Sequence, residues 1–420
     1  MKGFAIATSL LALIVLAALV PACGPTATPV PTSPPVAKPD TVTPPPPTDT
    51  PVPSTDAPKP PTPTPEPTAT PPAPTPPTPA SGAIASQLID TIEGLGATGQ
   101  FSGAALLALD GEPVFAKAYG LACRDPEQAN QVDTKFDLGS MGKMFTAVAI
   151  LQLVERGALS LEGRIVDVLP DYPNQEVAEQ VTIHHLLTHT AGMGDCFEGE
   201  FFSTPKAQLR TLEGYLPLFV DDPLQFEPGA QWAYSNEGYI VLGLIIEQVT
   251  GQSYWDYVGE NILEPSGMAD TGAYDQDAEV PNRAIGYTMF DAEGNDTGSL
   301  AENTPLMPVV GTSAGGSFST VEDLLRFANA LLSYRLLSPE STELLLGCKV
   351  EIREGRQYAY GFFDRTIRGQ RVVGHGGGAP GVCTMMDIFV DSGYTVIVLS
   401  NSDQDCYPVL EFLGQHPFVP

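Results

Sequence analysis

The sequence is most informative at residues 139–156, which read GSMGKMFTAVAILQLVER. Apolar residues recur at helical spacing from Met144 to Val154, and Gly157 follows as a stop signal. The pattern predicts a helix over residues 140–156 that is buried along much of its length. Its first turn carries Ser140 and Lys143.

Ser140 and Lys143 are three residues apart, so a helix places them on one face within reach of each other. A serine hydroxyl becomes a nucleophile when a nearby base takes its proton, and a lysine with a lowered pKa can be that base. The free N–H groups at a helix start also suit a developing oxyanion. The spacing alone is weak evidence, because Ser203 and Lys206 repeat it by chance.

Two further motifs follow along the chain. In Tyr234-Ser235-Asn236, a phenol can shuttle protons and an amide can hold a substrate carbonyl. Turn chemistry explains such residues equally well in isolation, and Tyr172 and Asn174 share the spacing. In the segment 375–378, His-Gly-Gly-Gly, a glycine run beside a strand lets a substrate backbone lie along the edge.

In this order, the three motifs resemble those of the superfamily of serine β-lactamases, DD-peptidases and related esterases. The flanking sequence resembles the class C-like branch of that superfamily. The matching segments are 186–192, 226–229, 262–268 and 374–381. The resemblance extends over residues 83–420.

The resemblance implies that Ser140 is the nucleophile, that Lys143 is its base or proton partner, and that Tyr234 is the companion acid and base. Which of the last two removes the proton stays open. The substrate-binding residues it implies are Asn236, His375, Gly377 and Gly378. The backbone N–H groups of Ser140 and Gly378 would form the oxyanion hole, and no cofactor or metal is implied.

The third motif departs from Lys-Thr-Gly. Family members that recognise a substrate carboxylate usually have a hydroxyl at the middle position, where this chain has Gly376, and His375 is a less reliable cation than lysine. The departure weakens the case for an efficient β-lactamase. It leaves esters, amides and D-amino-acid peptides as substrates.

Three alternative interpretations of the sequence compete with this one. Ser313 lies in a Gly-x-Ser-x-Gly sequence, as in α/β-hydrolases, but a parallel βα pattern is missing around it. His184, His185 and His189 are spaced for metal binding, without a recognisable acidic or cysteine partner. A cell-wall peptide-binding module without turnover is the third alternative, and the intact serine, lysine and tyrosine argue against it.

The expected fold class is α/β (α+β), with one antiparallel sheet built from both ends of the domain, flanking helices and an inserted all-helical lobe. Asp110-Gly111 predicts a hairpin. The predicted strands are 358–367, 370–375, 382–390 and 394–401. The predicted helices are 83–95, 140–156, 183–189, 236–249, 320–333 and 405–413.

The N-terminal residues are typical of an exported protein. Residues 1–23 are expected to form a signal segment that ends in a lipobox-like sequence, with Cys23 as the lipid attachment site. This sequence departs from the common lipobox at Pro21, and an uncleaved anchor helix or ordinary secretion are the alternatives. Of the 42 prolines, 24 lie between Pro25 and Pro79, which predicts a disordered linker over 24–82. The folded domain, 83–420, is then extracytoplasmic, either anchored to the bacterial membrane or secreted.

Charge and cysteine content constrain the partners. The formal charge is −30, nearly all of it on the domain, which disfavours nucleic acid as a partner. The expected partner is a small-molecule or cell-wall peptide substrate, and the expected state is a monomer. Counting back from the turn at 391–393 puts Cys383 near Cys406, which predicts a disulfide between them.

Overall fold

The computed structural model describes residues 79–416 and 418. The predicted signal segment with Cys23, and the linker from residue 24 to 78, lie outside the described residues. The first described helix, α1 (Pro79–Ala97), begins four residues earlier than the sequence pattern predicts. Proline is favoured in a first helical turn, where its missing N–H has no intrahelical partner to lose. None of the helices in the described part combines the length and apolar character needed to cross a membrane.

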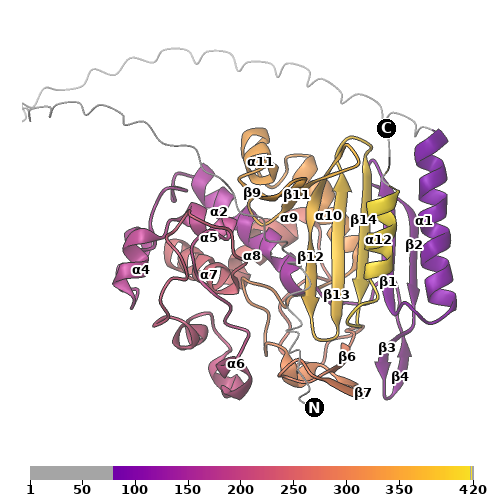
Figure 1. Ribbon diagram of the computed structural model, residues 1–420, viewed down its shortest axis with the longest axis horizontal. Helices are drawn as coiled ribbons and strands as arrows, with labels where there is room; N and C mark the ends of the chain where they lie inside the picture. Colours follow the sequence, from indigo (N-terminus) through magenta and orange to yellow (C-terminus); the bar gives the residue numbers. More distant parts are fainter. Residues whose placement is uncertain (1–78, 417, 419–420) are drawn as a thin grey trace, which may run out of the picture. The chain divides into compact units, whose positions relative to one another are not determined.

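One antiparallel sheet of eight strands organises the domain, in the order β2-β1-β14-β13-β12-β11-β10-β9 (Figure 1). Strand β1 (Gly103–Leu109) pairs with β14 (Tyr394–Ser400), so strands from the two ends of the domain lie side by side within the sheet. This confirms the predicted fold class. Asp110 and Gly111 both have positive φ, as a two-residue hairpin turn requires between β1 and β2 (Glu112–Tyr119).

The remaining strands of this sheet depart from the prediction in two places. They are β9 (Val350–Arg353), β10 (Arg356–Tyr358), β11 (Phe363–Ile367), β12 (Gln370–Ala379) and β13 (Val382–Phe389). The strand predicted at 358–367 is split by a turn, because Gly361 has positive φ and approaches helix α2 closely. Strand β12 runs four residues beyond its predicted end, so the glycines 376–378 lie within the strand and pair with β13.

Helices α1 and α12 (Tyr407–Gln415) cover one face of the sheet (Figure 1). Their apolar side chains pack with those of β1, β13 and β14 in a separate core. The predicted disulfide between Cys383 and Cys406 is present, with 5.5 Å between the Cα atoms. It ties β13 to the segment that leads into α12.

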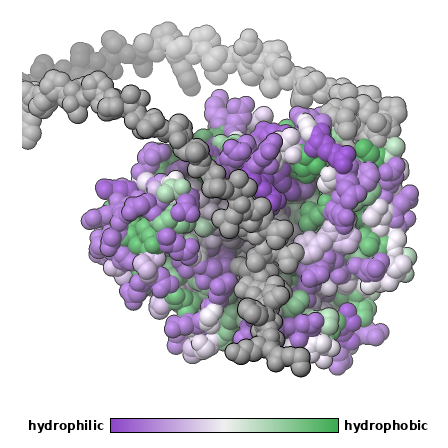
Figure 2. Space-filling model, in the orientation of Figure 1, coloured by the Kyte–Doolittle hydropathy of each residue, from purple (hydrophilic) through white to green (hydrophobic). Residues whose placement is uncertain are grey.

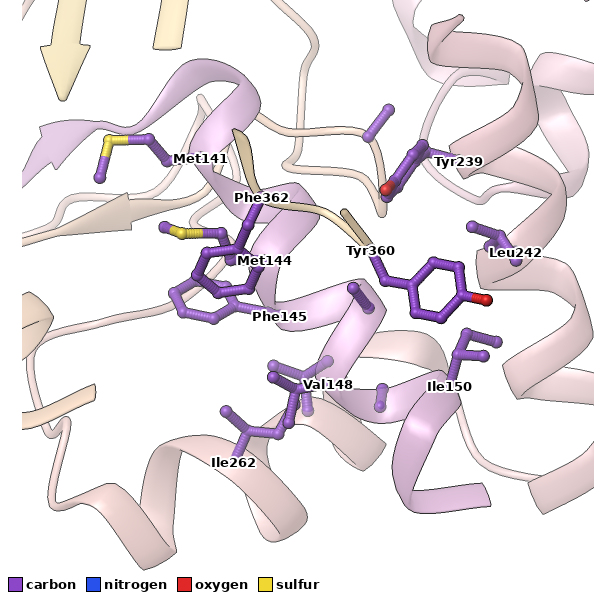
Figure 3. Close-up of a cluster of buried hydrophobic side chains, with 14 of the residues drawn as sticks. Met141, Met144, Phe145, Val148, Ile150, Tyr239, Leu242, Ile262, Tyr360 and Phe362 are labelled. Atoms are coloured by element: carbon purple, nitrogen blue, oxygen red, sulfur yellow. The ribbon is translucent and has the colours of Figure 1, made fainter. Parts of the chain in front are cut away.

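The other face carries the helical lobe around α2 (Lys143–Glu155), which is buried on every side. Figure 3 shows Phe362, from the turn between β10 and β11, beside Met144 and Phe145 of α2. Tyr360, from the same turn, lies nearer Leu242 and Ile150. The predicted helix start is a 3₁₀ turn, η2 (Gly139–Gly142), which holds Ser140 directly before α2. Hydrophilic residues dominate the face shown in Figure 2, as expected when the apolar side chains fill two cores.

The lobe is built mainly of helices. The longer ones are α7 (Asn236–Thr250), α10 (Val321–Leu332) and α11 (Pro339–Leu346). The short ones are α3 (Ile165–Val168), α4 (Gln175–Gln180), α5 (Ile183–Thr188), α6 (Glu200–Ser203), α8 (Tyr254–Val258) and α9 (Glu264–Ser266). Tighter or wider turns form η3 (Lys206–Gln208), η4 (Glu213–Leu218), η5 (Gly259–Leu263) and η6 (Thr304–Leu306).

The inserted region is not purely helical, contrary to the prediction. A hairpin, β6 (Tyr287–Phe290) and β7 (Asp296–Glu302), lies within it, and its short strand β8 (Phe318–Ser319) pairs with β5 (Phe136–Asp137). Another hairpin, β3 (Leu121–Arg124) and β4 (Glu127–Ala129), follows β2. The β5–β8 pair matters most for the site, because β5 leads directly into the turn that carries Ser140.

Candidate active site

Ser140 is held between strand β12 and the loop 311–317. Asp137 accepts a hydrogen bond from the N–H of Gly139 (2.8 Å), and burial raises the pKa of this carboxyl to about 6. Gly139 has φ +51°, and a side-chain carbon there would lie 3.1 Å from Gly378 N. A side-chain carbon at Gly315 would lie 2.4 Å from the Gly139 carbonyl oxygen. Glycines therefore let three backbone segments converge around Ser140.

Lys143 is fully buried directly beneath Ser140. Its Nζ lies 3.4 Å from Ser140 Oγ, 2.6 Å from Asn236 Oδ1 and 2.6 Å from the Ala314 carbonyl oxygen. Burial lowers the pKa of Lys143 to about 7, and the negative charge of Asp195 acts in the opposite direction. A neutral amine has two N–H donors, which match the two carbonyl acceptors, and its lone pair is then left for the Ser140 hydroxyl. The surroundings therefore suit lysine as a proton acceptor.

The ring of Tyr234 lies over the same amine, 4.8 Å from Lys143 Nζ. Burial raises the pKa of Tyr234, and the nearby Ser140 hydroxyl partly counters this effect. The phenol therefore stays protonated near neutral pH. The Tyr234 hydroxyl itself has no hydrogen-bond partner among the described residues. Ser140, Lys143 and Tyr234 meet in space as the sequence predicts.

Asn236, the first residue of α7, bridges Lys143 to a residue that the sequence did not indicate. Its amide nitrogen donates to both carboxylate oxygens of Asp195, at 2.9 and 2.8 Å. Because the carboxylate can only accept, the amide must turn its oxygen toward Lys143. The next residue, Glu237, points elsewhere and accepts the N–H of Gly194 (2.8 Å).

The third motif alternates along β12. His375 and Gly377 are buried, whereas Gly376 and Gly378 are exposed. Strand β11 stops pairing with β12 at Gly374, and so residues 375–379 pair only with β13 and present a free edge. A side-chain carbon at Gly378 would have no described atom within 4 Å. The free edge lies against the turn that carries Ser140. The oxyanion of a substrate carbonyl attacked by Ser140 would therefore develop beside this edge.

His375 does not present a charge to this edge. Its Nε2 lies 3.1 Å from the Tyr358 hydroxyl, and its Nδ1 lies 2.6 Å from the Gly376 carbonyl oxygen. Burial, and to a lesser extent the nearby Lys143, lower the pKa of His375 to about 3. Both ring nitrogens have partners within the protein, so this motif does not offer a cation in place of the family lysine.

The structure separates the competing sequence motifs from the site. Ser203 is exposed at the end of α6, and Lys206 donates to the Met307 carbonyl instead. Ser313 is fully buried, and it belongs to the loop whose Ala314 carbonyl accepts from Lys143. That loop lies beside an antiparallel sheet, so it is not the strand-to-helix turn of an α/β-hydrolase.

The three clustered histidines have partners in the protein. His184 Nδ1 lies 2.8 Å from the Tyr360 hydroxyl, and His185 Nδ1 accepts from the N–H of Thr182 (3.3 Å). His189 lies next to the site and is fully buried. Sequence analysis missed Asp195 and Tyr358, and the irregular conformation of the segment around Asp195 left no periodic pattern by which to find it.

The fold and the site together define a class: serine hydrolases that work through an acyl-enzyme. A family model described as Beta-lactamase matches residues 88–409. A penicillin-binding protein of Bacillus subtilis (strain 168) is 32% identical over 325 residues, which is 74% of this chain and 71% of that protein. The chain belongs to the β-lactamase family.

Solved structures agree with this assignment. A penicillin-binding protein from Bacillus halodurans matches with a TM-score of 0.71 and 34% identity, over 78% of this chain and 98% of that chain. A D-amino acid amidase from Ochrobactrum anthropi SV3, complexed with D-phenylalanine, matches with a TM-score of 0.67 and 25% identity. That match covers 78% of this chain and 97% of the amidase.

Proposed function

We propose that the enzyme hydrolyses an ester, an amide or a D-amino-acid peptide through an acyl-enzyme on Ser140. The observation that carries this proposal is the position of Lys143: buried, with a pKa of about 7, and 3.4 Å from the Ser140 hydroxyl. A lysine in this state is an amine for part of the time at neutral pH. It then accepts a proton from serine without a preceding deprotonation step.

In this proposal, Ser140 Oγ attacks the substrate carbonyl carbon while its proton moves to Lys143 Nζ. The N–H groups of Ser140 and Gly378 stabilise the oxyanion. Tyr234, protonated and beside both groups, passes a proton to the leaving group as the tetrahedral intermediate collapses, and takes the serine proton from Lys143 in its place. Water then attacks the acyl carbon and gives a proton to Lys143. As the second intermediate collapses, Ser140 Oγ leaves with a proton from Tyr234, which Lys143 replaces.

The substrate is held by the free edge of β12, with Gly377 and Gly378 supplying backbone groups. Asn236, which was expected to hold a substrate carbonyl, has its amide N–H groups on Asp195 and its oxygen on Lys143, so it positions the base instead. His375 supports the edge and does not bind the substrate as a cation, since both its nitrogens have internal partners. The D-amino acid amidase and penicillin-binding proteins among the similar structures support an acyl donor of the D-aminoacyl or D-peptide type.

A fluorophosphonate probe with peptide mass mapping tests the nucleophile. We expect label on Ser140 and its loss in Ser140→Ala, whereas Ser313→Ala should label normally. Label on Ser313 alone would refute the assignment. In the same preparation, hydrolysis assays with a nitrophenyl ester, a D-Ala-D-Ala peptide and a chromogenic cephalosporin identify the substrate class. Lys143→Ala and Tyr234→Phe should each lower turnover by about 10²-fold or more.

The domain is proposed to act outside the cytoplasm as a monomer, attached to the membrane by a lipid on Cys23 and separated from it by the proline-rich linker. The lipobox-like sequence and the disulfide between Cys383 and Cys406 support this location. Metabolic labelling with a radioactive fatty acid should mark the wild-type chain. Cys23→Ala should abolish the label.

A further inference from the structure

A chain of buried hydrogen bonds runs behind the catalytic residues, from the second motif to the third. It begins at the backbone N–H of Ser235, which donates to His189 Nδ1 (3.0 Å). His189 Nε2 lies 3.0 Å from the Tyr358 hydroxyl, which lies 3.1 Å from His375 Nε2. His375 Nδ1 ends the chain, 2.6 Å from the Gly376 carbonyl oxygen.

The two ends of the chain determine where every proton lies. A backbone N–H can only donate, so His189 Nδ1 is unprotonated and the ring carries its proton on Nε2. That proton is donated to the Tyr358 oxygen. At the other end a carbonyl can only accept, so His375 carries its proton on Nδ1 and its Nε2 accepts from Tyr358. Both ends require the same direction, and one tyrosine hydroxyl satisfies both histidines.

Both histidines are neutral in this arrangement. Burial lowers the pKa of each, and each is further lowered by the charge of Lys143. His375 also faces His189, Arg356 and Arg365, all of which disfavour a further positive charge. The arrangement therefore persists across the pH range in which the enzyme would work.

This chain of hydrogen bonds joins the helical lobe to the sheet. His189 caps α5 in the left-handed conformation, at φ 59°, which is uncommon for a non-glycine residue and brings its ring against Tyr234, 4.3 Å away between centroids. Tyr358 and His375 belong to the sheet. The glycines at 376–378 have much conformational freedom, and the Nδ1–H of His375 restrains them by holding the first carbonyl.

We propose that His189 and Tyr358 are positioning residues, which hold His375 as a neutral, Nδ1-protonated ring that fixes the glycine edge of β12 relative to Tyr234. The proposal rests on the function proposed above. If so, the third motif positions the backbone groups of the glycine edge and does not provide a positive charge. The oxyanion N–H of Gly378 lies two residues beyond the anchored carbonyl, so loosening the anchor displaces it.

Two variants interrupt the chain of hydrogen bonds at different points. Tyr358→Phe removes the hydroxyl on which both histidines depend. His189→Asn retains an acceptor for the Ser235 N–H and tolerates the left-handed conformation, but is too short to reach Tyr358. Tyr257→Phe is the matched control, because it removes the hydroxyl of another buried tyrosine, one that donates to Gln152.

The first readout is the rate of Ser140 labelling by the fluorophosphonate probe, together with kcat and KM for a nitrophenyl ester. We expect Tyr358→Phe and His189→Asn to lower the labelling rate and kcat by about 10- to 100-fold, with little change in KM, because a small displacement of reacting groups has this effect. Tyr257→Phe should retain the wild-type values. Wild-type kcat in a folded Tyr358→Phe or His189→Asn variant would overturn the proposal.

The second readout is ¹⁵N NMR of ring-labelled histidine, which does not depend on activity. In the full chain we expect His375 to be neutral with its proton on Nδ1, His189 to be neutral with its proton on Nε2, and neither to titrate between about pH 5 and 8. Tyr358→Phe should remove this pattern. An imidazolium or the opposite tautomer at His375 would overturn the proposal, whereas failure of Ser140 to react would refute only the proposed function.

Discussion

The side-chain oxygen of Asn236 lies 2.6 Å from the amine of Lys143, closer than the Ser140 hydroxyl at 3.4 Å. The amide nitrogen of Asn236 in turn donates hydrogen bonds to both carboxylate oxygens of Asp195, so the amide is held in one orientation. The base is therefore positioned by an acceptor that cannot rotate away.

The value of kcat/KM should rise as the pH increases through about 7, the pKa of Lys143. A group with a lowered pKa loses its proton as the pH rises through that value, and Lys143 accepts the serine proton only as the free amine. Activity should therefore fall about tenfold per pH unit on the acid side. A stopped-flow profile with an uncharged nitrophenyl ester measures this limb without titration of the substrate.

Glu237 provides the control for this assignment. Burial raises the pKa of its carboxyl to about 7 as well, so either group accounts for such a limb. Glu237→Gln removes the titrating group and keeps an oxygen for the Gly194 N–H. The acid limb should persist in this variant, and its disappearance would assign the limb to Glu237 instead of Lys143.

Asp195→Asn should shift the same limb toward lower pH. The carboxylate raises the pKa of Lys143 against the effect of burial, so its removal lowers that pKa further. An asparagine also no longer forces the amide of Asn236 into one orientation, and a hydrogen bond to a charged group contributes about 1.5–3 kcal/mol. We expect kcat to fall about tenfold at its optimum. A limb displaced toward higher pH would contradict this account.

The stability of the protein should depend on pH through Glu237. Its folded-state pKa is raised from 4.5 to about 7, so the stabilisation that it contributes is complete below about pH 4.5 and is lost as the pH rises through 7. Glu237→Gln should therefore be more stabilising at pH 8 than at pH 5, by a difference on the order of 3 kcal/mol. Urea unfolding at the two pH values measures this, with exposed Glu227→Gln as the control.

Local chemistry accounts for what the sequence predicted well. Asp110-Gly111 favours one kind of turn, and the turn fixes the register of β1 and β2. The disulfide followed from counting residues back from the next hairpin, because Cys383 pairs across from Ser400 in β14. Ser140 and Lys143 came together because their separation is short and the segment is helical. In each case neighbours in sequence determine the geometry.

The features that sequence analysis missed depend on contacts between distant segments. Asp195 lies in an irregular segment and meets Asn236 across 41 residues. Tyr358 meets His189 across 169 residues. Glycine is unfavourable in strands, so nothing in the run at 376–378 indicates that β12 continues, and pairing with β13 overrides that preference. Such contacts follow from the packing of the helical lobe against the sheet.

The enzyme should prefer an uncharged ester to a cephalosporin. A β-lactam carries a carboxylate that must be held while its ring opens, and the nitrogens of His375 are both engaged within the protein. Gly376 offers only its backbone. The negative charge of the domain adds a general repulsion for anions, although salt screens most of it. The measurement is kcat/KM for each substrate on one preparation, with Ser140→Ala as the blank.

Gly376→Thr should raise the cephalosporin value relative to the ester by about tenfold, since one hydrogen bond to a charged group contributes about 1.5–3 kcal/mol. A side-chain carbon at this position meets only the Thr384 carbonyl oxygen, at 3.3 Å, so a small shift accommodates it. Gly376→Val has the same shape without the hydroxyl and should leave the ratio unchanged. An equal rise in both variants would attribute the effect to the shape of the side chain. If the unmodified enzyme already hydrolyses the cephalosporin faster than the ester, β-lactam hydrolysis needs neither the cation nor the hydroxyl in the third motif.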